Sequence, residues 1–137
     1  MSVVHYLDTS AILKRAFREG GSAAFRVALD ASQSGGAALI TSALTRVEAG
    51  RALRRREAEL PGGADPALRV ILQGIAQAPV TGVVLELAKS LEPPAMRSLD
   101  AIHLATAIAL GARQLWTYDE RLADAAAFAG LAVRTPA

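Results

Sequence analysis

The sequence places four acidic residues where an apolar or small side chain would suit a packed domain better. They are Asp8, Glu48, Asp100 and Asp119. Asp8 directly follows a short apolar run, and Asp119 comes just after another one. Because ligands collect at the carboxyl ends of strands in parallel α/β sheets, we expect these two carboxylates to lie at one edge of a sheet.

The other two acids stand within segments of helical periodicity. Glu48 falls on one helical stripe with Leu44 and Val47, which are predicted to face inward, so its carboxylate is expected to be at least partly buried. Asp100 lies in the first turn of a helix that is apolar nearly all round and is therefore predicted to be buried. A buried carboxylate needs a cation or a proton.

Four carboxylates brought together repel one another, and a hard divalent cation relieves that repulsion. The chain has no cysteine, so oxygen ligands dominate, and they favour Mg²⁺ or Mn²⁺ over Zn²⁺.

Each acid alone also has a simpler interpretation. Asp8, Asp100 and Asp119 suit helix caps or turns, and Glu48 suits an ion pair with an arginine one or two turns further on.

The elements that must position these acids alternate along the chain. Strands are expected at residues 3–7, 38–41, 79–82, 114–117 and 131–134. Helices are expected at residues 11–15, 23–32, 43–59, 67–77, 84–91, 99–110 and 121–128. This alternation predicts an α/β fold in which helices cover both faces of a mostly parallel sheet. No linker or repeat divides the chain, so residues 1–137 are expected to form a single domain.

Composition narrows the class of protein. Of the 137 residues 52% are hydrophobic, which excludes a disordered chain, and only 4% are aromatic, which predicts an aliphatic core. Charges interrupt every apolar stretch before it could span a bilayer, and the first residues lack the features of a signal peptide. We therefore expect a cytoplasmic protein without membrane contact.

Thirteen of the fifteen basic residues are arginine, which suits contacts with phosphate.

Four segments, in this order and spacing, resemble the PIN domain, and specifically the small VapC-type toxins of prokaryotic toxin–antitoxin pairs. The segments are YLDTSAIL (residues 6–13), TRVEA (45–49), SLDAIHLATA (98–107) and TYD (117–119). The resemblance covers essentially the whole chain. It implies a Rossmann-like three-layer α/β/α sandwich with four to five strands, a cognate VapB-like antitoxin and a homodimer.

The resemblance also implies the chemistry. The family's acidic positions fall on Asp8, Glu48, Asp100 and Asp119, and its supporting hydroxyl positions on Thr9, Ser10 and Thr117. The expected activity is that of an endoribonuclease that uses Mg²⁺, or Mn²⁺, to hydrolyse RNA phosphodiester bonds. The three aspartates are expected to bind the metal, whereas Glu48 would bind metal or position water.

Other residues receive more modest interpretations. Arg51 and Arg55 lie one and two turns beyond Glu48 and are expected to hold RNA phosphates beside the scissile bond. His5 and His103 are interpreted as structural histidines.

A catalytically silent RNA- or protein-binding module of the same fold is the alternative function. A phospho-acceptor receiver domain is disfavoured because neither lysine of the chain follows a strand.

Overall fold

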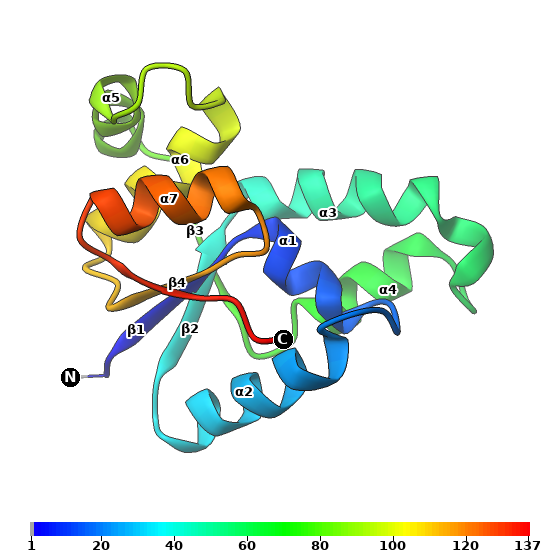
Figure 1. The fold of residues 1–137 in the computed structure, drawn as a ribbon. Coiled ribbons are helices and arrows are strands. Elements are labelled where there is room, and N and C mark those ends of the chain that lie inside the picture. The colour runs from blue at the N-terminus through cyan, green and yellow to red at the C-terminus, as the bar shows by residue number, and fades with distance from the viewer. Residues whose placement is uncertain (1) are drawn as a thin grey trace.

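The structure is a computed structural model and describes residues 2–137. Its centre is a five-stranded sheet in the order β3-β2-β1-β4-β5, and every neighbouring pair is parallel (Figure 1). The strands are β1 (Val4–Leu7), β2 (Ala38–Ser42), β3 (Ala76–Ala78), β4 (Gln114–Trp116) and β5 (Ala132–Arg134). Parallel strands need crossover connections, and helices supply them here.

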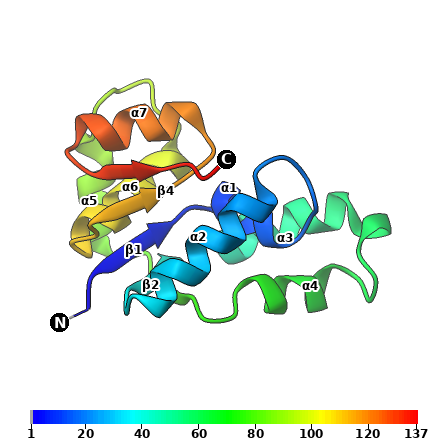
Figure 2. The ribbon, with the colours of Figure 1, turned by 60° about the horizontal axis from the view of Figure 1, so that its bottom comes forward.

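Seven α-helices and two short 3₁₀ turns cover the two faces of this sheet among the described residues. The helices are α1 (Thr9–Ile12), α2 (Ser22–Ser34), α3 (Leu44–Arg55), α4 (Ala64–Ile71), α5 (Gly82–Ser90), α6 (Ser98–Ala109) and α7 (Glu120–Phe128). The 3₁₀ turns are η1 (Leu13–Arg15) and η2 (Glu57–Glu59). Figure 2 shows α1, α2 and α4 on one side of the strands and α6 and α7 on the other.

The strand order creates a switch point between β1 and β4. From β1 the chain winds outward through β2 to β3, then returns to the other side of β1 to form β4 and β5. The crossovers therefore leave β1 and β4 in opposite directions, which opens a crevice at the carboxyl ends of these two strands. Asp8 follows β1 there, and its N–H donates to the carbonyl of Trp116 at the end of β4 at 3.1 Å.

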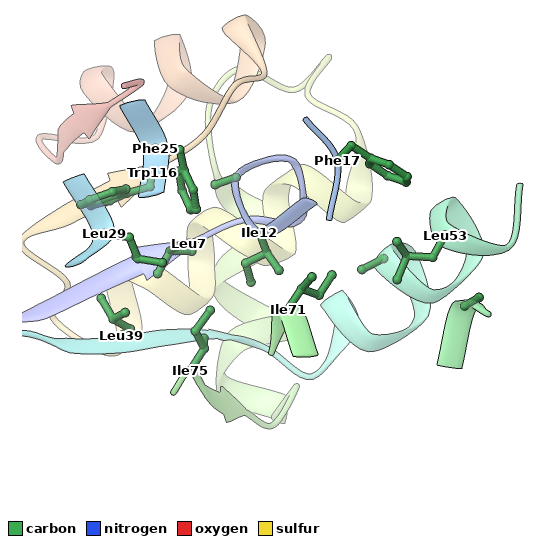
Figure 3. Close-up of a cluster of buried hydrophobic side chains, with 13 residues drawn as sticks. Leu7, Ile12, Phe17, Phe25, Leu29, Leu39, Leu53, Ile71, Ile75 and Trp116 are labelled. Atoms are coloured by element: carbon green, nitrogen blue, oxygen red, sulfur yellow. The ribbon is translucent and has the colours of Figure 1, made fainter. Parts of the chain in front are cut away.

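One hydrophobic cluster fills the space between the sheet and helices α1 to α4. Leu7, Leu39 and Trp116 contribute from the strands, and Ile12 and Phe25 from the helices (Figure 3). The Phe25 ring meets the Trp116 ring edge-on at 89°, with centroids 5.9 Å apart. This arrangement is favourable for an aromatic pair and fixes α2 beneath β4.

A second cluster lies on the opposite face of the sheet, beneath α6 and α7. It contains Tyr6 and Leu115 from the strands, Leu104 from α6 and Leu122 from α7. Neighbouring strand residues thus point to opposite clusters, as the two-residue period of a strand requires. Both faces of the sheet are buried, which explains why its central strands read as continuous apolar runs.

The predicted fold class is confirmed. The sheet is wholly parallel with five strands, and helices form a layer on each of its faces. Most predicted elements occur within one or two residues of their expected ends. Throughout the described chain, no helix combines the length and apolarity needed to cross a bilayer.

The strand predicted at residues 79–82 is wrong, and so is the end of the preceding helix. The third strand is Ala76–Ala78, and helix α4 ends at Ile71 rather than at residue 77. Gly74 adopts a left-handed φ of 77°, which ends the helical segment and lets the chain turn into the strand. Pro79 has no N–H to donate, so it follows the strand instead of pairing within it.

The predicted inward stripe of α3 is also corrected. Val47 is 60% exposed, and the residues that this helix buries are Thr45, Ala49 and Leu53. Thr45 faces inward because its hydroxyl hydrogen bonds with the hydroxyl of Thr41 at 2.8 Å. The helix ends at Arg55, before the predicted residue 59, and continues as the 3₁₀ turn η2.

The observed orientation of α3 can be tested with one substitution on its buried face and one on its exposed face. Replacing Leu53 with Ala is expected to lower the free energy of unfolding by roughly 2–5 kcal/mol, because it leaves a cavity in a fully buried site. Val47→Ala on the same helix is expected to change it by less than about 0.5 kcal/mol. Urea denaturation followed by circular dichroism measures both values. Equal losses for the two variants would contradict the observed orientation of α3.

Candidate active site

Asp8 lies at the centre of the crevice and is only 4% exposed. Its Oδ1 accepts hydrogen bonds from the backbone N–H of Ala11 at 2.9 Å and from the hydroxyl of Ser10 at 2.8 Å. Its Oδ2 accepts from the hydroxyl of Thr117 at 2.5 Å. Burial raises the pKa of Asp8 above its ordinary value, although these three donors oppose that rise. Positive charge placed near Asp8 would favour the ionised form of its carboxylate.

Thr117 connects Asp8 to Asp119. Its hydroxyl oxygen accepts from the backbone N–H of Asp119 at 3.0 Å while its proton goes to Asp8. Asp119 is the N-cap of α7, and its Oδ1 accepts from the N–H groups of Arg121 and Leu122 at 2.9 and 3.3 Å. These bonds satisfy the free donors at the helix start and fix the orientation of the Asp119 carboxylate.

Glu48 reaches the crevice from α3 and is partly buried. Its Oε1 accepts from the hydroxyl of Thr9 at 2.7 Å and lies 2.6 Å from Nε2 of His103. Burial works to raise the pKa of Glu48, but the bonds from His103 and Thr9 outweigh it, so the pKa is lowered. Glu48 is therefore held as a carboxylate.

His103 is a buried histidine in direct contact with the site. Nδ1 of its ring lies 2.6 Å from the hydroxyl of Tyr6, and Nε2 faces Glu48. Because a carboxylate only accepts, Nε2 carries a proton, and the hydroxyl of Tyr6 donates to Nδ1 when the ring is neutral. Burial raises the pKa of Tyr6, which keeps this hydroxyl protonated. His103 is satisfied on both nitrogens, as expected of a structural histidine, yet it also positions a site carboxylate.

Arg97 is a site residue that the sequence analysis did not identify. Its Nε donates to Oδ2 of Asp100 at 3.0 Å, and its Nη2 donates to Oδ2 of Asp119 at 2.7 Å. One guanidinium thus joins an acid of α6 to an acid of α7. The spacing from Arg97 to Asp100 across the start of a predicted helix was a signal for the first contact.

Hydrogen bonds, together with the peptide link between the neighbours Thr9 and Ser10, connect the four predicted acids in one series of contacts. Glu48 joins Thr9, whose neighbour Ser10 joins Asp8, and Thr117 leads from Asp8 to Asp119. Arg97 then leads on to Asp100. The structure thus brings the acids and the three predicted hydroxyl residues to one end of the sheet.

The donor set suits a hard divalent cation, since it consists of carboxylate oxygens supported by hydroxyl groups. Within residues 2–137, however, no three His, Asp or Glu side chains converge closely enough to share an ion. The guanidinium of Arg97 provides the positive charge between Asp100 and Asp119 instead. The residues therefore fit Mg²⁺ in chemical type, and Arg97 lies between two of the expected ligands.

Arg51 and Arg55 lie on the exposed surface of α3. Together with Arg54 and Glu57 they line a shallow hollow at the end of that helix. In the described residues neither arginine forms an ion pair with any of the four acids. The structure thus separates these two arginines from the hydrogen-bonded network.

Comparison with known proteins agrees with this fold. Residues 5–128 match the PIN domain family. The chain is 43% identical over 133 residues to ribonuclease VapC46 of Mycobacterium tuberculosis, covering 96% of both chains. It is 37% identical over 134 residues to ribonuclease VapC47 of the same species, again covering 96% of both. The chain therefore belongs to the PIN domain family, and these relatives are VapC ribonucleases.

Solved structures share the fold at lower identity. VapBC2 from Rickettsia felis, bound to a DNA fragment from its promoter, superposes with a TM-score of 0.77 at 11% identity, covering 98% of this chain and 100% of that one. VapC20 of Mycobacterium tuberculosis is described as a toxin that cleaves the sarcin–ricin loop. It superposes with a TM-score of 0.71 at 17% identity, covering 96% of this chain and 99% of that one. These likenesses support the architecture.

The pairing of Glu48 with His103 predicts a pH-dependent stability. Because the folded pKa of Glu48 lies below its ordinary value of 4.5, its stabilising contribution is present above that pH and is lost as the pH falls through the folded pKa. In EDTA, Glu48→Gln is expected to lower the free energy of unfolding by roughly 1–2 kcal/mol at pH 7. The difference from the parent chain should shrink below about pH 4.5.

Urea denaturation at several pH values measures this difference. Glu86→Gln serves as the control, because Glu86 is exposed and pairs only with Lys89 at the surface among the described residues. Glu86→Gln is expected to leave the free energy of unfolding nearly unchanged at pH 7. A Glu48→Gln difference that is constant from pH 7 to pH 3 would show that the carboxylate is not stabilised by its partners.

Proposed function

We propose that this protein is a divalent-metal-dependent endoribonuclease that hydrolyses RNA phosphodiester bonds and serves as the toxin of a type II VapBC-like toxin–antitoxin pair. The observation that carries this proposal is the network that links four acids at the switch point between β1 and β4. The names of the curated relatives, which are VapC ribonucleases, support it.

Asp8, Asp100 and Asp119 are the proposed metal ligands, directly or through water, and Glu48 is the proposed fourth acid. Mg²⁺ is the proposed ion, with Mn²⁺ as its substitute. When bound there, it would activate water as the nucleophile and offset the charge that develops on the phosphate. Glu48 either binds this ion or orients the attacking water.

The chain's own residues prepare this site before any substrate arrives. Ser10 and Thr117 donate to opposite oxygens of Asp8 and thereby fix the plane of its carboxylate. Thr9 and His103 do the same for Glu48 by donating to one oxygen and leaving the other free to act. Such supporting donors orient ligands and tune their basicity.

The charge distribution favours RNA as the substrate. Outside the four site acids, nine acidic residues remain against fifteen basic ones. Metal binding would also offset the negative charge of the site itself. This would lower the electrostatic repulsion between the site and an approaching RNA phosphate backbone. Arg51 and Arg55, both exposed on α3, are proposed to contact phosphates that flank the scissile bond.

A cognate VapB-like antitoxin and a second copy of the chain are the proposed protein partners, and the cytoplasm is the proposed location. The VapC names of the relatives support the antitoxin. Exposed apolar side chains on α5 and α6, among them Val83, Leu85 and Leu99, provide surface for a homodimer. Size-exclusion chromatography with light scattering tests the dimer, and a monomer at micromolar concentration would exclude it.

The second candidate is a catalytically silent RNA- or protein-binding module. One observation favours it, namely that Arg97 already occupies the space between Asp100 and Asp119. A module of this kind would bind RNA or a partner and leave RNA intact with every metal. The cleavage assay below separates the two functions.

Cleavage of RNA is expected to need the metal and the buried aspartate. The purified chain should cleave labelled RNA with Mg²⁺ or Mn²⁺ and lose this activity in EDTA. Asp8→Asn is expected to lower the cleavage rate at least about a hundredfold, and Thr117→Val about ten- to a hundredfold, because Thr117 only supports the ligand. Glu86→Gln is the surface control. Equal cleavage by Asp8→Asn would point to a contaminating nuclease.

Metal binding should also raise thermal stability. An ion that binds only the folded chain stabilises it by about 2.7 kcal/mol at a hundred times its Kd. Millimolar Mg²⁺ or Mn²⁺ is therefore expected to raise the Tm of the parent chain, and Asp100→Asn should abolish most of that rise. Differential scanning fluorimetry with Ca²⁺-free buffers measures it. A Tm that stays constant with both metals would contradict the proposed metal site.

A further inference from the structure

Arg97 differs from the acids that it joins in how far it is exposed. Its side chain is 63% exposed, whereas the side chains of Asp100 and Asp119 are 15% and 26% exposed. Asp119 is further tied to the start of α7, and Asp100 is set in the first turn of α6. The Asp119 carboxylate is therefore fixed by the fold and Asp100 is anchored through its helix, whereas the more exposed guanidinium is the part of this contact most able to move.

The oxygens that Arg97 uses are the ones a metal would need. Oδ1 of Asp119 is committed to backbone N–H groups of α7, so Oδ2 is its free oxygen, and Arg97 binds it. On Asp100, Arg97 also binds Oδ2. A guanidinium and a divalent cation repel each other at such a distance, so a metal bound to these oxygens favours the departure of the guanidinium.

A hollow beside the site gives the guanidinium somewhere to go. It measures about 770 Å³ and lies between residues 92–97 and helix α7, and both Arg97 and Asp100 line it. Arg121 and the exposed ring of Phe128 line its other side. The backbone of Arg97 is extended at the N-cap of α6, and its side chain makes no capping bond there. The i,i+3 pairing with Asp100 is thus the one contact by which the local helix geometry holds this side chain over the acids in the described residues.

We propose that Arg97 exchanges partners during the reaction cycle. Without metal it is the counter-ion of Asp100 and Asp119; when a divalent cation binds, it is displaced into the adjoining hollow and there binds an RNA phosphate next to the scissile bond. This inference rests on the proposed nuclease function and adds to it a residue that links metal binding to substrate binding.

The exchange follows from charge and geometry. The metal replaces the lost pairing of both aspartates, so their charge remains compensated after Arg97 leaves. The released guanidinium stays within one side-chain length of the acids, where the reacting phosphate must lie. A guanidinium forms paired hydrogen bonds with a phosphate as it does with a carboxylate. Arg97 thus has one suitable anion in each state.

The first test measures metal affinity without RNA. Since the parent chain binds metal only when Arg97 has moved away, its apparent affinity is reduced by the fraction of time that the site is free. Arg97→Gln is therefore expected to bind Mg²⁺ about three- to tenfold more tightly in isothermal titration calorimetry. Arg121→Gln is the matched control, because it removes one charge from the same hollow without breaking a pair with the acids.

The control sets the outcome that would overturn the proposal. Removing any positive charge near the site slightly favours a cation, so only a gain larger than that of Arg121→Gln supports displacement. An equal affinity for the parent chain and Arg97→Gln, or a weaker one in Arg97→Gln, would contradict it. Arg97→Lys is expected to lie between the parent and the Gln variant, because an ammonium pairs less well with two carboxylates at once.

The second test measures the KM for RNA at saturating Mg²⁺. Arg97→Gln is expected to raise KM about three- to tenfold and to make its dependence on salt shallower by roughly one unit, the signature of one lost phosphate contact. Arg69→Gln, on the distant helix α4, controls for net charge. An unchanged KM and salt dependence in Arg97→Gln would overturn the transfer of Arg97 to phosphate.

The two tests also separate this inference from the proposed function. If the parent chain binds neither Mg²⁺ nor Mn²⁺ and leaves RNA intact, the nuclease proposal itself fails. If the parent chain binds metal and cleaves RNA but Arg97→Gln matches it in metal affinity, the nuclease proposal stands and the exchange of partners fails.

Discussion

The site depends on one carboxylate, that of Asp8, held almost entirely out of water at the end of a buried strand. An ionised group in such a place is tolerated only when hydrogen-bond donors and positive charge surround it. Ser10, Ala11 and Thr117 supply the donors, and each of them comes from the first residues after β1 or β4. The same contacts start helix α1 and join the two strands. The fold therefore buries a carboxylate that depends on these donors, and a divalent cation is its proposed further partner.

The strand order brings two of the four candidate acids to one crevice. Only at the switch point do the ends of two adjacent strands open into a crevice instead of being closed by a crossover. Asp8 and Asp119 follow those two strands, and each also caps the helix that begins there. Capping interactions are worth roughly 1 kcal/mol each. The oxygens that stabilise the helix starts thus belong to the same carboxylates that are proposed to bind metal, so structural and chemical roles share one set of side chains.

Sequence alone predicted the parts of this arrangement that depend on local order along the chain. The acids that follow strands were identifiable because apolar runs ended at them, and the hydroxyl residues were neighbours of those acids. The buried face of α3 was not predictable in this way, because Thr45 turns inward to bond with Thr41, and hydropathy assigned Val47 to that place. Pro79 was assigned to a strand for its apolar neighbours, although the ladder ends before it. The first error arises because a tertiary hydrogen bond outweighs the pattern of hydrophobicity, and the second because proline has no N–H to pair in the ladder.

The partners of the basic residues at the site were even harder to predict from the sequence. Arg97 and His103 lie three residues before and after Asp100, yet their partners, Asp119 and Glu48, are distant in sequence. Their roles differ because their burial differs. His103 is enclosed and bonded at both ring nitrogens, so it holds Glu48 in one orientation. Arg97 is exposed and is held by hydrogen-bonded ion pairs at the surface, so its contact with the aspartates is the one most readily replaced by another cation. The site therefore contains one fixed and one displaceable counter-group, and the displaceable one lies where the hollow adjoins the acids.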